Sequence, residues 1–251
     1  PKVVAAILPL YLAELYLSRS SDNKEAPTLS DYFETPEEAV RHYGYLKQVY
    51  QSISAKEVYS SYVFPWDCVV LTRSDVVLKM AYIAWMTNDI RLREELCTYL
   101  PALESYNRAS YIGIVLARTE SKVEQEYVLQ SLGDRSADIR DEAYKVLSEM
   151  SLSPEQYQHI EELLRFKYSE MRINAINLLM KQPEAQLAAS IRRLLSDKNA
   201  ERRLAGLDMM KSIRNVDFLK DSYQKLLSTV REIQKPNAKE KILIESLIGD
   251  G

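Results

Sequence analysis

The chain has 251 residues, of which 46% are hydrophobic and 27% charged, with only 6 glycines and 9 prolines. That apolar content is enough for one or two hydrophobic cores and excludes a disordered chain. Six glycines are too few for most all-β folds and for the glycine-lined phosphate loops of nucleotide-binding α/β folds. The formal net charge of −3 argues against a general binder of nucleic acids or anionic membranes.

The first residues are typical of a short helix rather than of a secretory signal. Lys2 precedes the apolar run Val3–Ala13, as in a signal peptide, but Pro9 interrupts the run and Glu14 follows it. No apolar run reaches the ~18 residues that a membrane span requires. We therefore expect a soluble, cytoplasmic protein that makes no membrane contact.

Residues 1–35 are expected to form an N-terminal helix and an exposed loop, ahead of a helical repeat array over residues 36–251. The loop prediction concerns residues 18–35, which are rich in Ser, Asp, Asn, Lys and Pro. This stretch is either a long surface loop, which we favour, or a linker between the N-terminal element and the array. The chain begins with Pro1 instead of Met, from which we expect a piece of a longer protein.

Two sequence signatures mark helix starts. Thr35–Glu38 and Ser153–Gln156 each place a hydroxyl side chain before a proline, and an acidic or amide residue at the third helical position. Such a cap typically contributes about 1 kcal/mol to its helix. Apolar residues recur at spacings of three and four after both signatures. The same spacing predicts further helices near residues 73–86, 88–99, 102–118, 121–132, 137–149, 170–181, 184–195, 199–213, 216–232 and 238–248.

Alternation typical of strands is confined to Tyr62–Phe64 and Cys68–Leu71. Two such short runs are not expected to build a sheet. The predicted helical fraction far exceeds the roughly one-third that is usual in soluble proteins. The sequence therefore predicts an all-α fold.

A pattern of apolar, small and basic residues repeats along the middle of the chain with a period of 31 to 32 residues, and a weaker copy begins at Leu100. Helical periodicity alone would preserve the apolar spacing but not the arginine, so the repeat indicates stacked helix pairs. The small residue of each copy is expected to let helices approach closely. The matching residues, copy by copy, are Leu132, Asp134, Ile139, Arg140, Ala143 and Leu147; Leu164, Phe166, Met171, Arg172, Ala175 and Leu179; and Leu195, Asp197, Arg202, Arg203, Gly206 and Met210.

These residues resemble the HEAT repeat of the armadillo-like helical family, in which an Asp precedes by six residues an Arg that opens the second helix. Asp134 and Arg140 keep this spacing, whereas Phe166 replaces the Asp in the middle copy. The resemblance implies a right-handed α-solenoid of stacked antiparallel helix pairs, an ARM-type superhelix, that is clearest over residues 100–215. It also implies a structural ladder between consecutive repeats, made by Asp134, Arg140, Arg172, Asp197 and Arg203.

Motifs of catalysis and cofactor binding are missing from the sequence, which has no G-x-G-x-x-G, G-x-x-x-x-G-K, H-E-x-x-H or G-x-S-x-G segment. His42 follows Glu38 by four residues, a spacing that suits two metal ligands on one helix face. A third ligand is not evident, so a solvated pair is favoured. Cys68 and Cys97 are expected to be reduced thiols. We predict no cofactor, metal or catalytic residue, and favour a non-enzymatic role.

Two features remain as candidate binding surfaces. Seven basic and three acidic residues give a local charge of +4 across residues 186–214. This cluster resembles the basic surface of HEAT-like bacterial DNA glycosylases, although a solvated and ladder-paired cluster is favoured. The second feature is tyrosine, with 17 Tyr against 4 Phe and 12 of the tyrosines before residue 112. Tyrosine suits half-exposed interfaces, but ordinary helix packing is the favoured interpretation.

The leading functional hypothesis is a non-catalytic, protein-binding scaffold module of a larger bacterial protein. The bacterial origin is suggested by Ala200–Asp208, which resembles a helical segment of large bacterial proteins of unknown function. The predicted partner contacts lie on the polar side of the second helices, at Lys145, Asn174, Asn177, Asp208 and Lys211. The alternative is a nucleic-acid-binding or DNA-repair module that uses the basic cluster through Arg192, Arg193, Lys198 and Arg202. A third option is a piece that positions a catalytic domain elsewhere in the longer protein.

Overall fold

The computed structural model describes residues 33–54, 59–64, 67–166 and 169–249. The predicted N-terminal helix and nearly all of the predicted loop over residues 18–35 lie outside the described residues. The chain divides into two compact units, residues 1–127 and 128–251. The division falls within helix α6, Lys122–Ser131.

The described part of the chain is all-α in character, with twelve α-helices, two short 3₁₀ helices and one β-hairpin. The helices that precede α6 are α2 (Pro36–Ser52), α3 (Arg73–Thr87), α4 (Ile90–Leu96), η3 (Leu100–Ala102) and α5 (Ser105–Ile114). Those that follow it are α7 (Ala137–Glu149), α8 (Pro154–Leu163), α9 (Ser169–Leu179), α10 (Glu184–Leu195), α11 (Ala200–Ile213), η4 (Asp217–Leu219), α12 (Lys220–Arg231) and α13 (Ala238–Ile248). Every predicted helix in this range has a counterpart, and the bounds of α7, α10 and α13 equal the predicted ones.

The expectation that the two strand-like runs would not form a sheet was wrong. Strands β1 (Tyr59–Phe64) and β2 (Asp67–Leu71) pair as an antiparallel two-stranded sheet, with Tyr59 opposite Leu71. Only two residues separate the strands in sequence, so their pairing closes a very short loop at little cost in conformational entropy. The register shifts between Tyr62 and Phe64.

Side-chain caps explain where several helices begin. At the start of α8, the Ser153 hydroxyl accepts a hydrogen bond from the backbone N–H of Gln156, whose side chain accepts one from the Ser153 N–H. This is the predicted capping box. At the start of α2, the Thr35 hydroxyl accepts from the Glu38 N–H, but the Glu38 carboxylate accepts from the Glu34 N–H instead. The predicted cap therefore forms there in a variant shifted by one residue.

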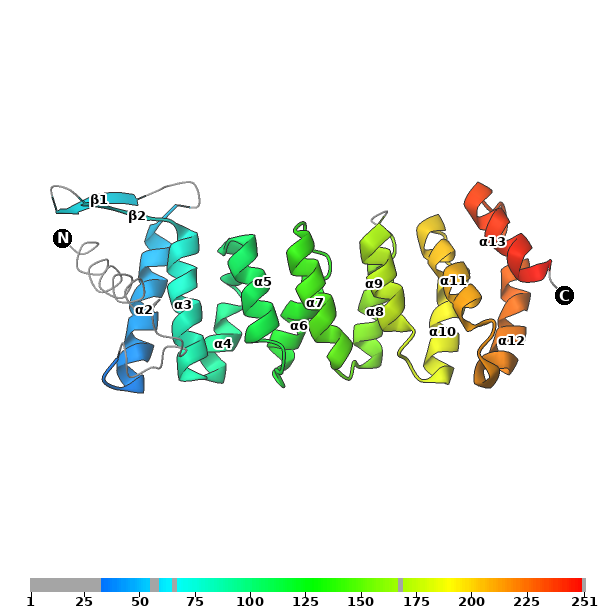
Figure 1. Cartoon of the computed structure of the whole chain (residues 1–251), viewed down its shortest axis with the longest axis horizontal. Helices are drawn as coiled ribbons and strands as arrows, with labels where there is room; N and C mark the ends of the chain where they lie inside the picture. The colour runs from blue at the N-terminus through cyan, green and yellow to red at the C-terminus, as the bar shows by residue number, and fades with distance from the viewer. Residues whose placement is uncertain (1–32, 55–58, 65–66, 167–168, 250–251) are drawn as a thin grey trace. The chain divides into compact units, whose positions relative to one another are not determined.

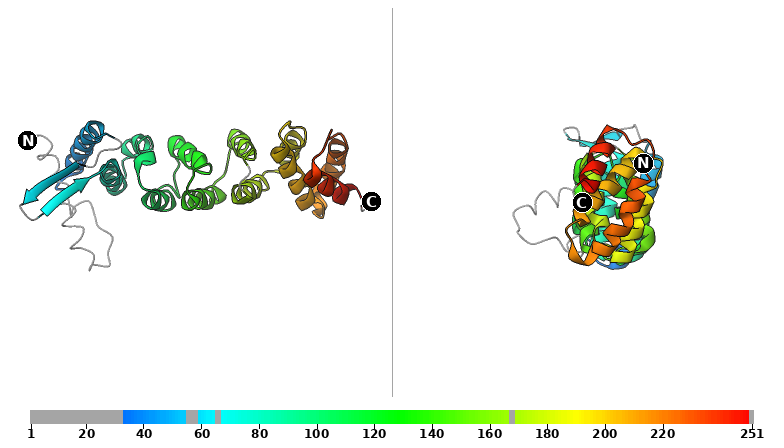
Figure 2. Two further views of the ribbon diagram at one scale, coloured as in Figure 1. Left: turned by 90° about the horizontal axis from the view of Figure 1, so that it is seen from above. Right: turned by 90° about the vertical axis from the view of Figure 1, so that its right-hand side faces the viewer.

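The helices of the second unit pack as pairs in two rows (Figures 1 and 2). In one row α10 contacts both α8 and α12, and in the other row α9 contacts α7 and α11, while α11 also contacts α13. Each pair closes across the rows, α8 with α9, α10 with α11 and α12 with α13. We call α7, α9, α11 and α13 the second-helix row. Between the rows lie buried Leu, Ile and Met side chains.

Small residues sit where these helices come closest. A Cβ atom at Gly206 would lie 3.1 Å from Leu194 Cβ and 3.2 Å from Leu195 Cγ. Ala143 and Ala175 are 0% and 2% exposed. The expected close approach of helices at the small positions is therefore confirmed most directly at Gly206, on the face that α11 turns toward α10.

We predict that Ala175→Leu lowers the free energy of unfolding by about 1–3 kcal/mol, because the added carbons overpack a filled site. The hollow beside Ala175 has a volume of only about 10 Å³, less than a methyl group needs. Urea denaturation followed by circular dichroism measures the change. Asn177→Leu, on an exposed position of the same helix, is the control. Equal stability of the two variants would contradict this packing.

Candidate functional site

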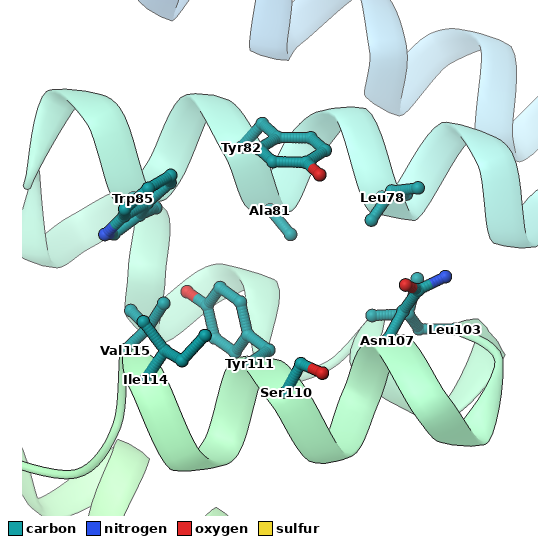
Figure 3. A pocket seen from close by; sticks show the side chains of 10 residues that line it. All are labelled: Leu78, Ala81, Tyr82, Trp85, Leu103, Asn107, Ser110, Tyr111, Ile114 and Val115. Carbon is teal, nitrogen blue, oxygen red and sulfur yellow. The ribbon is translucent and has the colours of Figure 1, made fainter. Parts of the chain in front are cut away.

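An aromatic groove lies between α3 and α5 in the first unit (Figure 3). Its volume is about 130 Å³. Leu78, Tyr82 and Trp85 recur along α3 at spacings of four and three residues, so they share one helix face. We call this the α3–α5 groove, and its lining residues are Leu78, Ala81, Tyr82, Trp85, Leu103, Asn107, Ser110, Tyr111, Ile114 and Val115.

The two walls of the groove are held together at one end. The backbone N–H of Glu104, which precedes α5, donates a hydrogen bond to Ser74 Oγ in the first turn of α3 at 3.1 Å. η3 also packs against α3. Ile114 lines the groove and is 69% exposed, so its side chain also reaches solvent beside the groove.

The Tyr111 hydroxyl is the unusual polar group of the groove. The Tyr111 residue is 7% exposed, yet within the described chain its hydroxyl has no hydrogen-bond partner. In Figure 3 this hydroxyl points across the groove toward Trp85. Burial raises the pKa of Tyr111, and the nearby Glu124 carboxylate raises it further. Tyr111 is therefore a neutral hydrogen-bond donor throughout the physiological pH range.

A buried ion pair lies near Tyr111. The Glu124 carboxylate, which is 0% exposed, accepts hydrogen bonds from Arg93 Nε at 2.9 Å and Arg93 Nη2 at 2.8 Å. The Thr119 hydroxyl donates to the same carboxylate. Arg93 lies on α4 and Glu124 on α6, so the pair fixes one helix pair against the next. A buried carboxylate with three donors is fully satisfied, which suits a structural role.

Cys97 belongs to the same buried region. Its thiol is free and its Sγ lies 3.5 Å from the carbonyl oxygen of Arg93. Burial, and then the carboxylates of Glu124 and Glu94, raise the pKa of Cys97 to about 12. A thiol with so high a pKa is not a nucleophile at neutral pH. The side chain of the other cysteine, Cys68, lies outside the described part of the structure.

In the second unit, an arginine at the fourth position of three second-row helices contacts the next helix of that row. Arg140 on α7 lies 3.7 Å from Glu170 on α9, and Arg203 Nε on α11 donates to Glu240 on α13 at 2.7 Å. Arg172 on α9 pairs with two carboxylates on α11, those of Glu201 and Asp208. We call these contacts the arginine ladder.

The aspartates of the predicted ladder have a different role. Asp134 and Asp197 each accept a hydrogen bond from the backbone N–H two residues further on, at 2.9 and 2.7 Å. The carbonyl oxygens of both aspartates accept from the arginine six residues later, Arg140 and Arg203. The aspartates thus fix their own turns, and the glutamates receive the arginines of the preceding helix.

The residues predicted to contact a protein partner fall into two groups. Lys145, Asn177 and Lys211 are exposed, and Lys145 forms a 2.6 Å ion pair with Glu142 on its own helix. Asn174 is half-buried beside the small hollow near Ala175, and Asp208 is bound by Arg172. The same surface also holds a residue that the sequence analysis did not select, Ile173, which is 57% exposed. Its position four residues before Asn177 could have revealed it.

The basic cluster of residues 186–214 is largely engaged in ion pairs. Arg193 donates to the buried Glu161 carboxylate at 2.6 and 3.1 Å, and Arg202 pairs with Asp197 at 2.7 Å. Arg203 is part of the arginine ladder. Arg192 and Lys198 are exposed near the turn between α10 and α11, and within the described residues neither has a recorded ion pair.

The structure gives no support to a metal site at His42. His42 Nε2 lies 3.9 Å from Glu38 Oε1, and the ring packs near Phe33 and Tyr45. Among the residues that the structure places, no three His, Cys, Asp or Glu side chains gather closely enough to hold a metal. In the same part of the chain, no helix combines the length and the apolar character needed to cross a membrane.

The sequence matches the model of a family of unknown function, DUF5724, over residues 1–250. The chain belongs to DUF5724. No curated protein and no solved structure matches it. For this DUF5724 chain, functional inference therefore rests on the geometry of the α3–α5 groove and of the second-helix row.

The buried ion pair of the DUF5724 chain can be tested by mutation. Arg93→Ala leaves the Glu124 carboxylate buried without its cation, which should lower the free energy of unfolding by about 3–5 kcal/mol. Arg91→Ala is the control, because Arg91 lies on the same helix but pairs with Asp89 at the surface, with its side chain 84% exposed. Its stability should be unchanged in urea denaturation. Equal effects of the two substitutions would contradict the structural role of Arg93.

Proposed function

We propose that this chain is a HEAT-like α-solenoid module, right-handed and non-catalytic, that binds a protein partner in the cytoplasm. Three features support the solenoid. The sequence repeats at 31 to 32 residues, the helices of the second unit pack in two rows, and the arginine ladder recurs at one helix position. Repeat arrays of this kind commonly use an extended surface for binding rather than a catalytic pocket.

The observation that carries the proposal is an exposed apolar residue among polar ones on the second-helix row. Ile173 is 57% exposed on α9, and the exposed Asn177 follows one turn later. Lys145 and Asp208 occupy the position of Asn177 in the preceding and following repeats. An apolar centre within a polar rim is the usual arrangement of a protein-binding surface.

Charge reversal tests this surface. We expect Lys145→Glu combined with Lys211→Glu to abolish the recovery of at least one partner from source-cell lysate, because both side chains are exposed on the second-helix row. Lys225→Glu on α12, at an exposed position of the other row, should leave recovery intact. Ile173→Asp should act like the double variant. If every recovered protein persists in both the double variant and Ile173→Asp, this surface is not the binding site.

A nucleic-acid-binding function is the second candidate. It draws support from Arg192 and Lys198, which lie exposed near the turn between α10 and α11. Arg193 and Arg202 are less suited to phosphate contacts because their guanidinium groups already bind Glu161 and Asp197.

This second candidate predicts binding to duplex DNA at low salt that weakens steeply as salt is added. Arg192→Glu combined with Lys198→Glu should remove the binding in a gel-shift titration, whereas Lys225→Glu should not. We avoid Arg193→Glu, since it would place a second carboxylate beside Glu161 and unfold the region. The absence of any shift at low salt would end this candidate.

A further inference from the structure

We propose that the α3–α5 groove binds one apolar side chain from an extended segment of a partner protein, and that the Tyr111 hydroxyl donates a hydrogen bond to a backbone carbonyl of that segment. The groove lies in the first unit and is separate from the second-helix surface of the proposed function. The inference depends on the proposed function only in that the occupant is a protein.

The size of the groove selects a single side chain. Its volume is about 130 Å³, while an apolar cavity of about 150 Å³ holds one benzene molecule. Sites for drug-sized ligands and cofactors are larger, about 300–1,000 Å³. A leucine or phenylalanine side chain fits the groove, and buried anchors of this kind dominate many protein interfaces.

The lining of the groove selects an uncharged occupant. Tyr82, Trp85 and Ile114 supply most of its apolar surface, and none of its lining residues carries a charge. A carboxylate, phosphate or ammonium group would lose its hydration there without gaining an opposite charge. Aromatic walls favour instead an aliphatic or aromatic side chain.

The Tyr111 hydroxyl points to a hydrogen-bond acceptor beside that side chain. This donor is buried and has no partner within the described residues, so the free protein has given up its hydration without compensation. Asn107 and Ser110 line the same wall and offer both donors and acceptors. Together these groups match the N–H and C=O groups of a peptide backbone.

The acceptor also determines the conformation of the bound segment. In the interior of a helix, backbone carbonyl groups are already bonded to N–H groups four residues further on. A carbonyl available to Tyr111 therefore belongs to an extended segment, whose backbone groups remain unpaired before binding. The proposal thus excludes an amphipathic helix lying in the groove.

The test is an NMR titration of ¹⁵N-labelled full chain with blocked pentapeptides of sequence Gly-Gly-X-Gly-Gly. We expect peptides with X = Leu or Phe to shift the Trp85 indole N–H and the Asn107 side-chain amide saturably. Peptides with X = Asp or Lys should not shift them. If no peptide shifts these signals, or if the charged peptides bind as well as the apolar ones, the proposal is wrong.

Variants identify the atoms involved. Tyr111→Phe should melt at the same or a higher temperature than the parent chain, because it removes only an unpartnered hydroxyl, and should weaken peptide binding about two- to tenfold. Ser110→Leu should abolish binding by filling the groove. Tyr106→Phe is the control, since Tyr106 is 77% exposed and does not line the groove. Unchanged affinity of Tyr111→Phe would overturn the hydrogen bond to the segment.

Two further outcomes separate this inference from the proposed function. Toluene that binds as tightly as the Phe peptide would overturn a protein segment as the occupant. The Lys145→Glu, Lys211→Glu double variant should bind the peptides normally. A positive titration with a negative pull-down would then leave the groove in place and remove the second-helix surface, and the reverse pair of results would do the opposite.

Discussion

Buried glutamates paired with arginines from neighbouring helices are the constraint on which the packing of helix pairs depends. Glu124, Glu161 and Glu240 are 0–2% exposed, and each is bound by an arginine: Arg93, Arg193 and Arg203 respectively. A buried carboxylate is tolerated only when it is paired and hydrogen-bonded. A slip of one helix pair along the next by a turn would separate these charges. The ion pairs therefore favour one register among several that apolar side chains alone would accept.

The same constraint changes the meaning of the charge distribution. The cluster of residues 186–214 is strongly basic when read along the sequence, but Arg193 and Arg203 are directed at glutamates that lie more than 30 residues away. Arg172 binds Glu201 and Asp208, two of the acidic residues counted against the cluster. Much of the local positive charge is thus neutralised between helices, which leaves the exposed Arg192 and Lys198 to represent it at the surface.

The sequence was sufficient for local structure because caps and apolar spacing act within one helix. It predicted the capping box at Ser153, the bounds of α10 and the small residue at Gly206. It did not predict the α3–α5 groove, since Tyr82 and Tyr111 belong to different helices and no period relates them. The partner of Arg193 was missed for another reason: Glu161 lies one repeat earlier on the first-row helix, whereas the HEAT resemblance directed attention to aspartates before the second helix.

The arginine ladder and the α3–α5 groove treat buried polar groups in opposite ways. Glu240 receives Arg203 and the backbone N–H of Asn237, so folding itself satisfies the carboxylate. Tyr111 is as well shielded from water, yet folding leaves its hydroxyl without a partner. Replacing that hydroxyl by hydrogen would cost the fold nothing, so packing alone does not explain why tyrosine rather than phenylalanine stands at this position. An acceptor supplied from outside the chain does explain it, which makes the hydroxyl a binding group rather than a packing group.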